Sequence, residues 1–258
     1  MNMQPGIPEE IADWPDRLEA VAFASGFQAV RVVAECGSTQ ELARAIGLGA
    51  VVAAGRQTTG RGRQGRSWDD GDGRSVSISL AVPAATIPRL CIGSALAVLD
   101  AIEDLQGVRL PELGTKFPND LVSRDGRKIA GILVECASHV AVVGIGINVH
   151  AREWEPPVQG LSLEEMGMDV KRIDVMQTLL PAIHRRLQMS RKELVRDFQD
   201  RHLPTGSEVC LWFGEEKVTG VLKGVDPFGM VEVDCEGRTA QVPASYCRHM
   251  EWSGNTDD

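Results

Sequence analysis

GRQTTGRGRQGRSW, residues Gly55–Trp68, is the stretch that decides between two kinds of fold for this chain. Within it, Gly60, Gly62 and Gly65 match the G-x-G-x-x-G pattern of dinucleotide-binding proteins, and GRGRQGRS differs by one residue from the phosphate-binding P-loop pattern. Both patterns require a helix that begins where the loop ends, because the N–H groups of its first turn hold the phosphates. Here the loop is followed by SWDDGDGRS and then by the alternating stretch SVSISLAV. We therefore predict a strand after the loop, and neither a dinucleotide-binding fold nor a P-loop fold.

The same loop is rich in arginine and has no acidic residue before Asp69; its arginines are Arg56, Arg61, Arg63 and Arg66. Glycine lets a backbone approach a ligand closely, and the planar fork of arginine suits phosphate and carboxylate groups. Because neighbouring cations repel one another, we expect the loop to be mobile until an anion binds and then to close over it. A solvated surface loop with incidental arginines is the alternative, which these residues alone leave open.

The composition of the chain excludes some classes of partner. The sequence has 258 residues, a formal net charge of −9 and a pI near 5.1, which argues against general affinity for nucleic acid or for an anionic membrane. It has no apolar run long enough to span a membrane and no export signal at its N-terminus, so we expect a soluble, cytoplasmic protein. The six cysteines form no C-x-x-C pair, and we expect buried thiols in a reducing compartment, not disulfides or zinc ligands.

Helices are indicated at three places in the first half of the chain. We predict one over 15–25 and another over Pro88–Gln106, each followed by a glycine at which a helix can end. A shorter helix begins at Ser38, which the spacing pairs with Glu41 in a capping box, and ends near Gly47.

Alternating or continuous apolar stretches between these helices predict strands. AVRVVAEC and AVVAAG precede the arginine loop, and SVSISLAV follows it with Val76, Ile78 and Leu80 on one face. LGTKFPNDLVS and RKIAGILVECAS are joined by Asp125-Gly126, a strong signal for a two-residue hairpin turn, and HVAVVGIGINV comes next. This mixture of hairpins and inserted helices favours an α+β class, with helices packed on a mainly antiparallel or mixed sheet, over a doubly wound fold.

The chain changes character at Pro204. Residues 172–201 have a helical pattern, in which Pro181 predicts a kink or a break. The residues after Pro204 form short strands separated by turns, a spacing that predicts a small barrel of about 45 residues. We therefore expect a larger domain over 1–204, a barrel over 205–250 and a tail over 251–258.

Polar residues stand in three places where strands should be apolar. Lys116, Asn119 and Asp120 flank a proline in TKFPNDL. Lys128 precedes a glycine in RKIAGIL, and Asn148 closes the strand of GIGINV. Each has a plain structural explanation: a lysine at a sheet edge, an Asx turn, or a residue that ends a strand. Together with the arginine loop, they supply the cations and the carboxylate that nucleotidyl transfer from Mg²⁺-ATP requires. The five histidines are dispersed and predict neither a catalytic triad nor a metal cluster.

Five stretches, in this order, closely resemble the biotin protein ligases, also called biotin–[acetyl-CoA-carboxylase] ligases: STQELA, QTTGRGRQGRSW, KFPNDL, RKIAGILVE and GIGINV. The resemblance runs from about Val32 to Val149, and the C-terminal strands are similar to the small SH3-like domain of that family. It implies a biotin/lipoate ligase-like catalytic domain over 1–204. Regulatory members carry a winged helix-turn-helix domain before this region. Too few residues precede the resemblance here to form one, so we expect a ligase of the non-regulatory type.

The chemistry that the resemblance implies has two steps. The biotin carboxylate attacks the α-phosphate of Mg²⁺-ATP, which gives biotinyl-5′-AMP and pyrophosphate. A lysine of a biotin carboxyl carrier protein, or of a carrier domain of a biotin-dependent carboxylase, then takes the biotinyl group as an amide. The implied partner is this carrier, with no nucleic acid and no membrane, and the protein would be a monomer or a homodimer.

The resemblance also implies roles for individual residues. Lys128, Arg61 and Arg63 would be catalytic. Lys128 would touch both the biotin carboxyl group and the α-phosphate, and the two arginines would fold over biotin and the adenylate phosphate. Asp120 would bind Mg²⁺. The residues that would contact biotin are Ser38, Thr39, Gln57, Gly60, Arg61, Lys128, Gly131 and Ile132. The residues that would contact the nucleotide are Arg63, Trp68, Lys116, Asn119 and Asn148.

Three residues depart from the family pattern. Phe117 stands in place of a usual tryptophan, Gln40 in place of a common asparagine, and Gln64 in place of a frequent arginine. These differences concern substrate details and not the expected reaction.

Two alternative functions stay open. One is a ligase for a related acid such as lipoate or octanoate, against which the arginine loop argues. The other is a non-catalytic paralogue that holds biotin without transferring it, against which the presence of Lys128, Arg61 and Arg63 argues.

Overall fold

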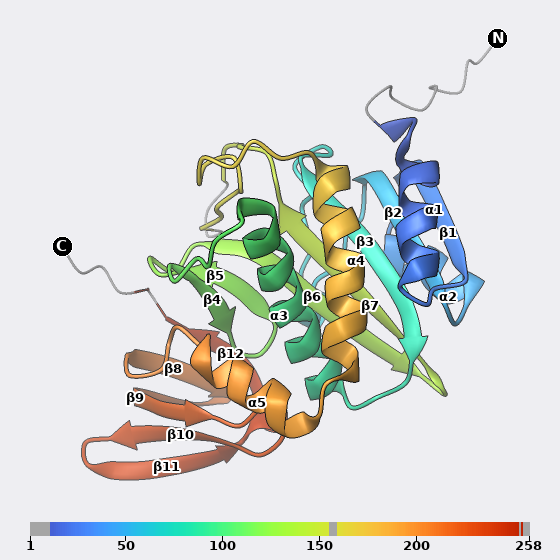
Figure 1. The fold of residues 1–258 in the computed structure, drawn as a ribbon. Helices are drawn as coiled ribbons and strands as arrows, with labels where there is room; N and C mark the ends of the chain where they lie inside the picture. Colours follow the sequence, from blue (N-terminus) through green and yellow to red (C-terminus); the bar gives the residue numbers. More distant parts are fainter. Residues whose placement is uncertain (1–10, 155–158, 253, 255–258) are drawn as a thin grey trace.

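The computed structural model describes residues 11–154, 159–252 and 254, so most of the expected tail over 251–258 lies outside the described residues. The strands form two sheets, and helices pack against them. Figure 1 shows the C-terminal sheet at the lower left, beside α5. The elements are α1 (Trp14–Ala24), β1 (Ala29–Cys36), α2 (Thr39–Ile46), β2 (Ala50–Gln57), β3 (Ser75–Pro83), α3 (Ile87–Gln106), β4 (Leu113–Lys116), β5 (Asp120–Ser123), β6 (Lys128–Ala137), β7 (Val140–Asn148), α4 (Arg172–Gln188), α5 (Arg191–Asp200), β8 (Glu208–Phe213), β9 (Glu216–Val225), β10 (Met230–Cys235), β11 (Arg238–Pro243) and β12 (Cys247–Glu251).

The larger sheet has seven strands in the order β1-β2-β3-β7-β6-β5-β4. The pair β1 and β2 is parallel, and every other neighbouring pair is antiparallel. The helices α1, α3 and α4 pack on the sheet, and α4 contacts both α1 and α3, whereas α2 packs separately on β2, β3 and β7 (Figure 1). This architecture confirms the α+β class and the mainly antiparallel, mixed sheet.

The central strand β3 separates two buried environments. Its Val76, Ile78 and Leu80 share one face, as expected, and belong to the main core with side chains of α1, α3 and α4. Its serines, including Ser77 and Ser79, are also buried, on the face that packs against α2. The alternation in SVSISLAV therefore places apolar side chains in the main core on one face of β3 and serines in a buried polar layer on the other face. Neither face is open to solvent.

The capping box predicted at the start of α2 is wrong. Ser38 is the residue before the helix, but its side chain makes no capping hydrogen bond. Its hydroxyl is buried and has no hydrogen-bond partner within the described chain. The spacing of Ser38 and Glu41 is that of a capping box, yet the hydroxyl takes no part in a cap.

Of the kink or break predicted at Pro181, the break is wrong. The helix α4 continues through Pro181 and ends at Gln188, and α5 then begins after Ser190. Proline removes one helical hydrogen bond. Leu179, Leu180 and Ile183 on either side of it are buried in the core, and burial of this apolar face outweighs the local preference.

The hairpin predicted at Asp125-Gly126 connects β5 to β6, and its position is confirmed. Of these two residues only Gly126 has a left-handed φ, 86°, and Ser123 N–H donates to Arg127 O at 2.9 Å. The connection is therefore a three-residue loop with glycine at its last position, and not a two-residue turn.

The C-terminal sheet has five antiparallel strands in the order β11-β10-β9-β8-β12, in agreement with the expected SH3-like unit. Its core is shared with the rest of the molecule. Ile92 and Leu96 of α3, together with Phe117 before β5, pack in one cluster with buried residues of the C-terminal strands. The exact boundary between the two parts stays a prediction.

All six cysteines are free. Cys91 and Cys247 are buried, but Cys136 is exposed, so the expectation of buried thiols is wrong for Cys136. It lies near the end of β6, where the last two residues of the strand are exposed. Among the described helices, none has both the length and the apolar character needed to cross a membrane.

Candidate functional site

A buried polar layer lies between the start of α2 and the polar face of β3. Thr39 Oγ1 lies 2.8 Å from Ser79 Oγ, and both the N–H and the hydroxyl of Thr39 donate to Gln57 Oε1, at 2.8 and 3.1 Å. Gln57 Nε2 in turn donates to Ser77 Oγ at 3.2 Å. The sequence identified Thr39 and Gln57 but not the two serines; their signal was the polar half of the β3 alternation.

Two groups in this region still have hydrogen-bonding capacity. Ser38 Oγ and Gln40 Oε1 are buried and have no hydrogen-bond partner among the described residues, and each residue is 3% exposed. Buried polar groups are nearly always paired, because leaving one unpaired costs free energy. A small polar group placed between α2 and the sheet could therefore donate hydrogen bonds to Ser38 Oγ and Gln40 Oε1, and could accept one from the Ser38 hydroxyl.

Beside the polar layer, four neighbouring strands place one row of residues on the same line. Ser77 of β3 pairs with Gly146 of β7, Gly146 with Gly131 of β6, and Gly131 with Asp120 of β5. Asp120 in turn pairs with Lys116 of β4. The row thus runs from the polar layer across two glycines to a carboxylate and an ammonium group. We call it the glycine row.

The ring of Trp68 lies on the two glycines of this row. A Cβ on Gly146 would lie 2.2 Å from Trp68 Cε2, and a Cβ on Gly131 would lie 3.3 Å from Trp68 Cζ3. The indole Nε1 is buried without a hydrogen-bond partner in the described chain, and Lys128 Nζ lies 5.8 Å from the ring centroid. Glycine is required at Gly146 because any side chain would occupy the space of the indole.

The charged end of the glycine row is a cluster of two lysines and one carboxylate. Lys128 Nζ lies 2.7 Å from Asp120 Oδ1, an ion pair without the direction of a hydrogen bond. Burial lowers the pKa of Lys116; the Asp120 carboxylate opposes that shift, and the Lys128 ammonium adds to it. The cluster carries more positive than negative charge in a partly dehydrated place, which suits an anionic ligand.

The arginine loop closes on itself beside this cluster. Trp68 N–H donates to Gly60 O at 2.9 Å, and Gly62 N–H donates to Arg66 O at 2.7 Å. The single turn within the loop spans only Arg63–Gly65, and β3 follows, so the predicted strand after the loop is confirmed. At its base, the buried Asp70 accepts the N–H groups of Gln57 and Gly73, and burial raises the pKa of the Asp70 carboxyl group.

The arginines of the loop do not form one uncompensated group, which corrects the expectation drawn from their spacing. Arg56 pairs with Glu35 and Asp72, at 3.3 and 2.8 Å. Arg61 pairs with Glu135 of β6 at 2.9 Å. Acidic residues far away in the sequence therefore neutralise two of the four cations.

The two asparagines of the site hold backbone or loop groups. Asn119 Oδ1 accepts from Arg63 Nη1, and its Nδ2 donates to Ile132 O, both at 2.9 Å. Asn148 is 3% exposed, and its Nδ2 donates to Lys128 O at 2.9 Å and to Leu161 O at 3.3 Å. Their contacts with a nucleotide stay predictions. The side chain of Ile132 belongs to the main core, so only its backbone is near the glycine row.

The C-terminal sheet also reaches the site, which sequence reasoning missed. Gln64 Nε2 of the arginine loop donates to Arg248 O of β12 at 3.2 Å. Burial lowers the pKa of His249 in the same strand, and the nearby charges of Arg66 and Lys116 lower it further. No local pattern in β12 distinguishes these residues, because their place at the site depends on how the two sheets pack.

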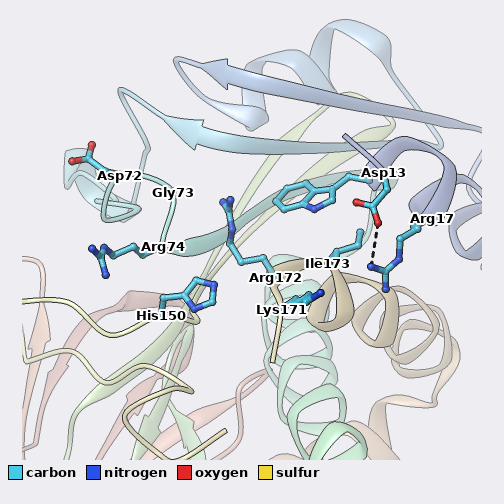
Figure 2. A pocket seen from close by; sticks show the side chains of 10 residues that line it. Asp13, Arg17, Asp72, Gly73, Arg74, His150, Lys171, Arg172 and Ile173 are labelled. Atoms are coloured by element: carbon cyan, nitrogen blue, oxygen red, sulfur yellow. Dashed lines mark ion pairs between the residues drawn. The ribbon is translucent and has the colours of Figure 1, made fainter. Parts of the chain in front are cut away.

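A hollow of about 640 Å³ opens elsewhere, between α1, the start of α4 and the turn before β3. Figure 2 shows the Asp13–Arg17 ion pair on one side of it and Arg74 with His150 on the other. None of its lining residues belongs to the predicted site. Arg172, which lines it, is buried and donates to Gly55 O at 2.6 Å. This part of the cavity wall therefore serves to hold the backbone of β2.

Comparisons with known proteins place this fold, with its polar layer, glycine row and lysine cluster, in the class of biotin and lipoate protein ligases. Residues 43–151 match the model of the Biotin/lipoate A/B protein ligase family. The biotin–[acetyl-CoA-carboxylase] ligase of Mycobacterium tuberculosis is 34% identical over 250 residues, which cover 91% of this chain and 94% of that protein. The bifunctional ligase/repressor BirA of Bacillus subtilis is 32% identical over 54% of this chain and 46% of its own length.

Solved structures agree with these relatives. The biotin protein ligase from Aquifex aeolicus in complex with biotin and ATP has a TM-score of 0.77 and 28% identity, covering 87% of this chain and 99% of that one. The chain belongs to the biotin protein ligase family.

Proposed function

We propose that this protein is an ATP-dependent biotin protein ligase that acts in two steps. It joins the biotin carboxylate to the α-phosphate of Mg²⁺-ATP, which gives biotinyl-5′-AMP and pyrophosphate. It then transfers the biotinyl group to a lysine of a carrier domain of a biotin-dependent carboxylase. Its family and its relatives support this reaction.

The glycine row is the observation that carries the proposal. It offers a flat path from buried hydroxyl and amide groups to an ammonium group, which fits a ligand with a neutral polar head at one end and a carboxylate at the other. The head group would lie against Ser38, Thr39 and Gln57. Because Trp68 lies on the two glycines, its ring would leave this path as biotin enters and become available to the adenine.

The positive charges have a direct role in the first step. A carboxylate that attacks a polyphosphate meets like-charge repulsion, so fixed cations must neutralise both reactants. Lys128 would contact the biotin carboxylate and the α-phosphate, Arg61 and Arg63 would cover the adenylate, and Lys116 would bind the phosphates. When Arg61 leaves Glu135, its fork becomes available to the new acyl phosphate, which a closed loop also protects from water.

The residues present fit a Mg²⁺ ion that arrives with ATP. Mg²⁺ in such sites is usually held by one or two carboxylates together with substrate phosphates. Asp120 Oδ1 is buried and has an ion-pair partner but no directed hydrogen bond, so it can serve as that carboxylate. When bound, the ion would withdraw charge from the phosphates, while Lys128 and Lys116 keep the substrate in place.

The C-terminal sheet would contribute to the same site from β12, and we propose the division at 204/205 as the border between a catalytic and an SH3-like domain. The carrier domain would approach the open end of the arginine loop, which presents the biotinyl group. The protein would work in the cytoplasm, where its six free cysteines stay reduced.

The test is transfer of biotin to a carrier domain of known competence, with purified protein, biotin and Mg²⁺-ATP. We expect biotin-dependent pyrophosphate release and a carrier that gains one biotinyl group. Lipoate in place of biotin should give neither. A carrier that a reference ligase biotinylates, but that this protein leaves unmodified, would refute the proposal.

A further inference from the structure

His202 is a buried side chain outside every site that sequence or family assigns to this protein. It is 6% exposed and lies in the segment between α5 and the C-terminal sheet. Its Nε2 accepts the backbone N–H of Phe117 at 3.1 Å, and its Nδ1 lies 2.9 Å from Thr205 Oγ1. One imidazole ring thus connects the linking segment to the turn that carries Lys116, Asn119 and Asp120.

The partners of His202 fix its protonation state. A backbone N–H can only donate, so Nε2 must be unprotonated, and the ring proton must be on Nδ1, where it reaches the hydroxyl of Thr205. Burial agrees with this neutral form, because it lowers the pKa of His202 to about 3. The ring also packs on Phe198 with centroids 5.0 Å apart, and Phe198 contacts Phe117 with centroids 6.4 Å apart.

The backbone on both sides of the ring strengthens the connection. Thr115 N–H donates to Arg201 O at 2.7 Å, and Leu203 N–H donates to Thr115 O at 3.2 Å. The segment around His202 therefore runs beside the edge strand β4 and pairs with it at Thr115. A Cβ on Gly114 would lie 2.3 Å from Arg201 O, so glycine is needed for this close approach.

We propose that His202 is a positioning residue that holds the Lys116–Asp120 turn in its active place, so that it controls how the site binds the nucleotide. This inference rests on the proposed function, in which Lys116 and Asp120 handle the phosphates of Mg²⁺-ATP. The hydrogen bond to Phe117 lies one residue from Lys116 and fixes the backbone there. Through the same turn, a shift would displace Asp120 from Lys128 and Asn119 from Arg63. Within the described residues, no side-chain hydrogen bond connects His202 to the polar layer near α2.

A matched pair of substitutions separates the two hydrogen bonds of the ring. In His202→Gln, the amide oxygen reaches the place of Nε2 and can still accept from Phe117 N–H. In His202→Asn, the amide nitrogen reaches the place of Nδ1 and can donate to Thr205, but nothing accepts from Phe117. Both variants lose the aromatic ring and each keeps a different one of its two hydrogen bonds, so their difference shows which bond matters for the nucleotide.

The experiment measures biotin-dependent exchange of pyrophosphate into ATP with the full chain. We expect His202→Asn to raise the KM for ATP about tenfold, the usual cost of one buried hydrogen bond, with the KM for biotin nearly unchanged. We expect His202→Gln to restore the KM for ATP to within about threefold of the wild type. Equal losses in both variants, or losses that follow thermal stability for both substrates, would show that the ring only fills space and would overturn the proposal.

A second readout does not depend on activity. Amide hydrogen exchange of Phe117 should be slow in the wild type and in His202→Gln, and fast in His202→Asn. If the wild type shows no pyrophosphate exchange, the proposed function fails, and the Phe117 amide still decides whether His202 holds the turn. Equal protection in the two variants would contradict that role.

The neighbouring Thr205 provides variants that disturb the fold least, because this residue is exposed. Thr205→Val removes the partner of Nδ1 and allows the other tautomer, whose Nε2 proton faces the N–H of Phe117. We expect Thr205→Val to raise the KM for ATP, but by less than His202→Asn does. Thr205→Ser should match the wild type. If the His202 variants do not fold, the Thr205 variants decide. A normal KM for ATP in Thr205→Val would then count against the proposal.

Discussion

At the scale of single residues, the charged side chains of the site have partners on neighbouring strands or loops. Lys128 pairs with Asp120, Arg61 with Glu135, and Ser38 retains a buried hydroxyl without a partner in the described chain. Residue types and the family resemblance predicted roles for these side chains. Their partners became visible only in the fold.

The first prediction concerns Lys128. In Lys128→Ala, the cation beside the biotin carboxylate and the α-phosphate is lost, so adenylate formation should fall by about 10²–10³ or more. The side chain is 32% exposed, so the melting temperature should change little. The exposed Lys192→Ala in α5 is the control and should retain full pyrophosphate exchange. Near-normal turnover of Lys128→Ala would remove the role assigned to this residue.

A second prediction concerns stability against pH at His202. Its folded pKa is lowered to about 3 from an ordinary 6.5, so the unfolded chain binds this proton first as the pH falls. The contribution of His202 to stability is therefore complete above pH 6.5 and decreases below it, by about 1.4 kcal/mol for each pH unit.

Urea unfolding of the wild type and of His202→Gln measures this effect. The difference in unfolding free energy between them should become smaller by about 2 kcal/mol from pH 7.5 to pH 5, because glutamine does not titrate. Other titrating groups are common to both proteins and cancel. A difference that is constant over this range would mean that His202 titrates equally in both states.

At the scale of elements, strands and loops of different origin form one surface. The row from Ser77 through Gly146 and Gly131 to Asp120 exists because β3, β7, β6 and β5 are neighbours in the sheet. The arginine loop then places Trp68 on the two glycines. Neither GIGINV nor RKIAGIL reveals by itself that its glycine faces an indole.

A third prediction tests this contact. In Gly146→Ala, the new methyl group would lie 2.2 Å from Trp68 Cε2, so the ring must move or the sheet must shift. Overpacking of this kind costs typically about 1–3 kcal/mol. Chemical unfolding should show this loss, and pyrophosphate exchange should fall because the loop no longer closes normally. Gly224→Ala in β9 is the control, since an added Cβ there meets no atom within 4 Å. Equal stability of the two variants would contradict the position of Trp68.

At the scale of the whole molecule, the two sheets share one helix. Leu96 of α3 is 1% exposed and packs with the C-terminal cluster, whereas Leu99, one turn further along, packs in the main core. The C-terminal sheet also contacts the arginine loop through Arg248 O. A helix that belongs to both cores should make the two parts unfold together.

The fourth prediction follows from this sharing. Leu96→Ala and Leu99→Ala should each destabilise by about 2–5 kcal/mol, as large-to-small core substitutions do. Calorimetry should show one transition in both variants, with equal calorimetric and van't Hoff enthalpies. An early separate transition in Leu96→Ala alone would mean that the C-terminal sheet unfolds independently.

The sequence by itself determined the elements, the α+β class and the family. Periodicity and glycine placement report on local backbone structure and on burial, and a strand after the arginine loop excluded the phosphate-binding helix that its glycines would otherwise suggest. Pro181 and Ser38 show the limit of such reasoning, because core packing kept α4 continuous and left the Ser38 hydroxyl out of the cap.

Only the tertiary structure decided which charges meet, where Trp68 lies and what His202 holds. Ion pairs such as Arg61 with Glu135 and hydrogen bonds such as Phe117 with His202 join residues that are far apart in the sequence. Such contacts depend on strand order and on the packing of the two sheets, to which local patterns are insensitive. The loop GRQTTGRGRQGRSW therefore helped to identify the family. The order of the strands in the sheet decided which acidic residues and glycines the loop contacts.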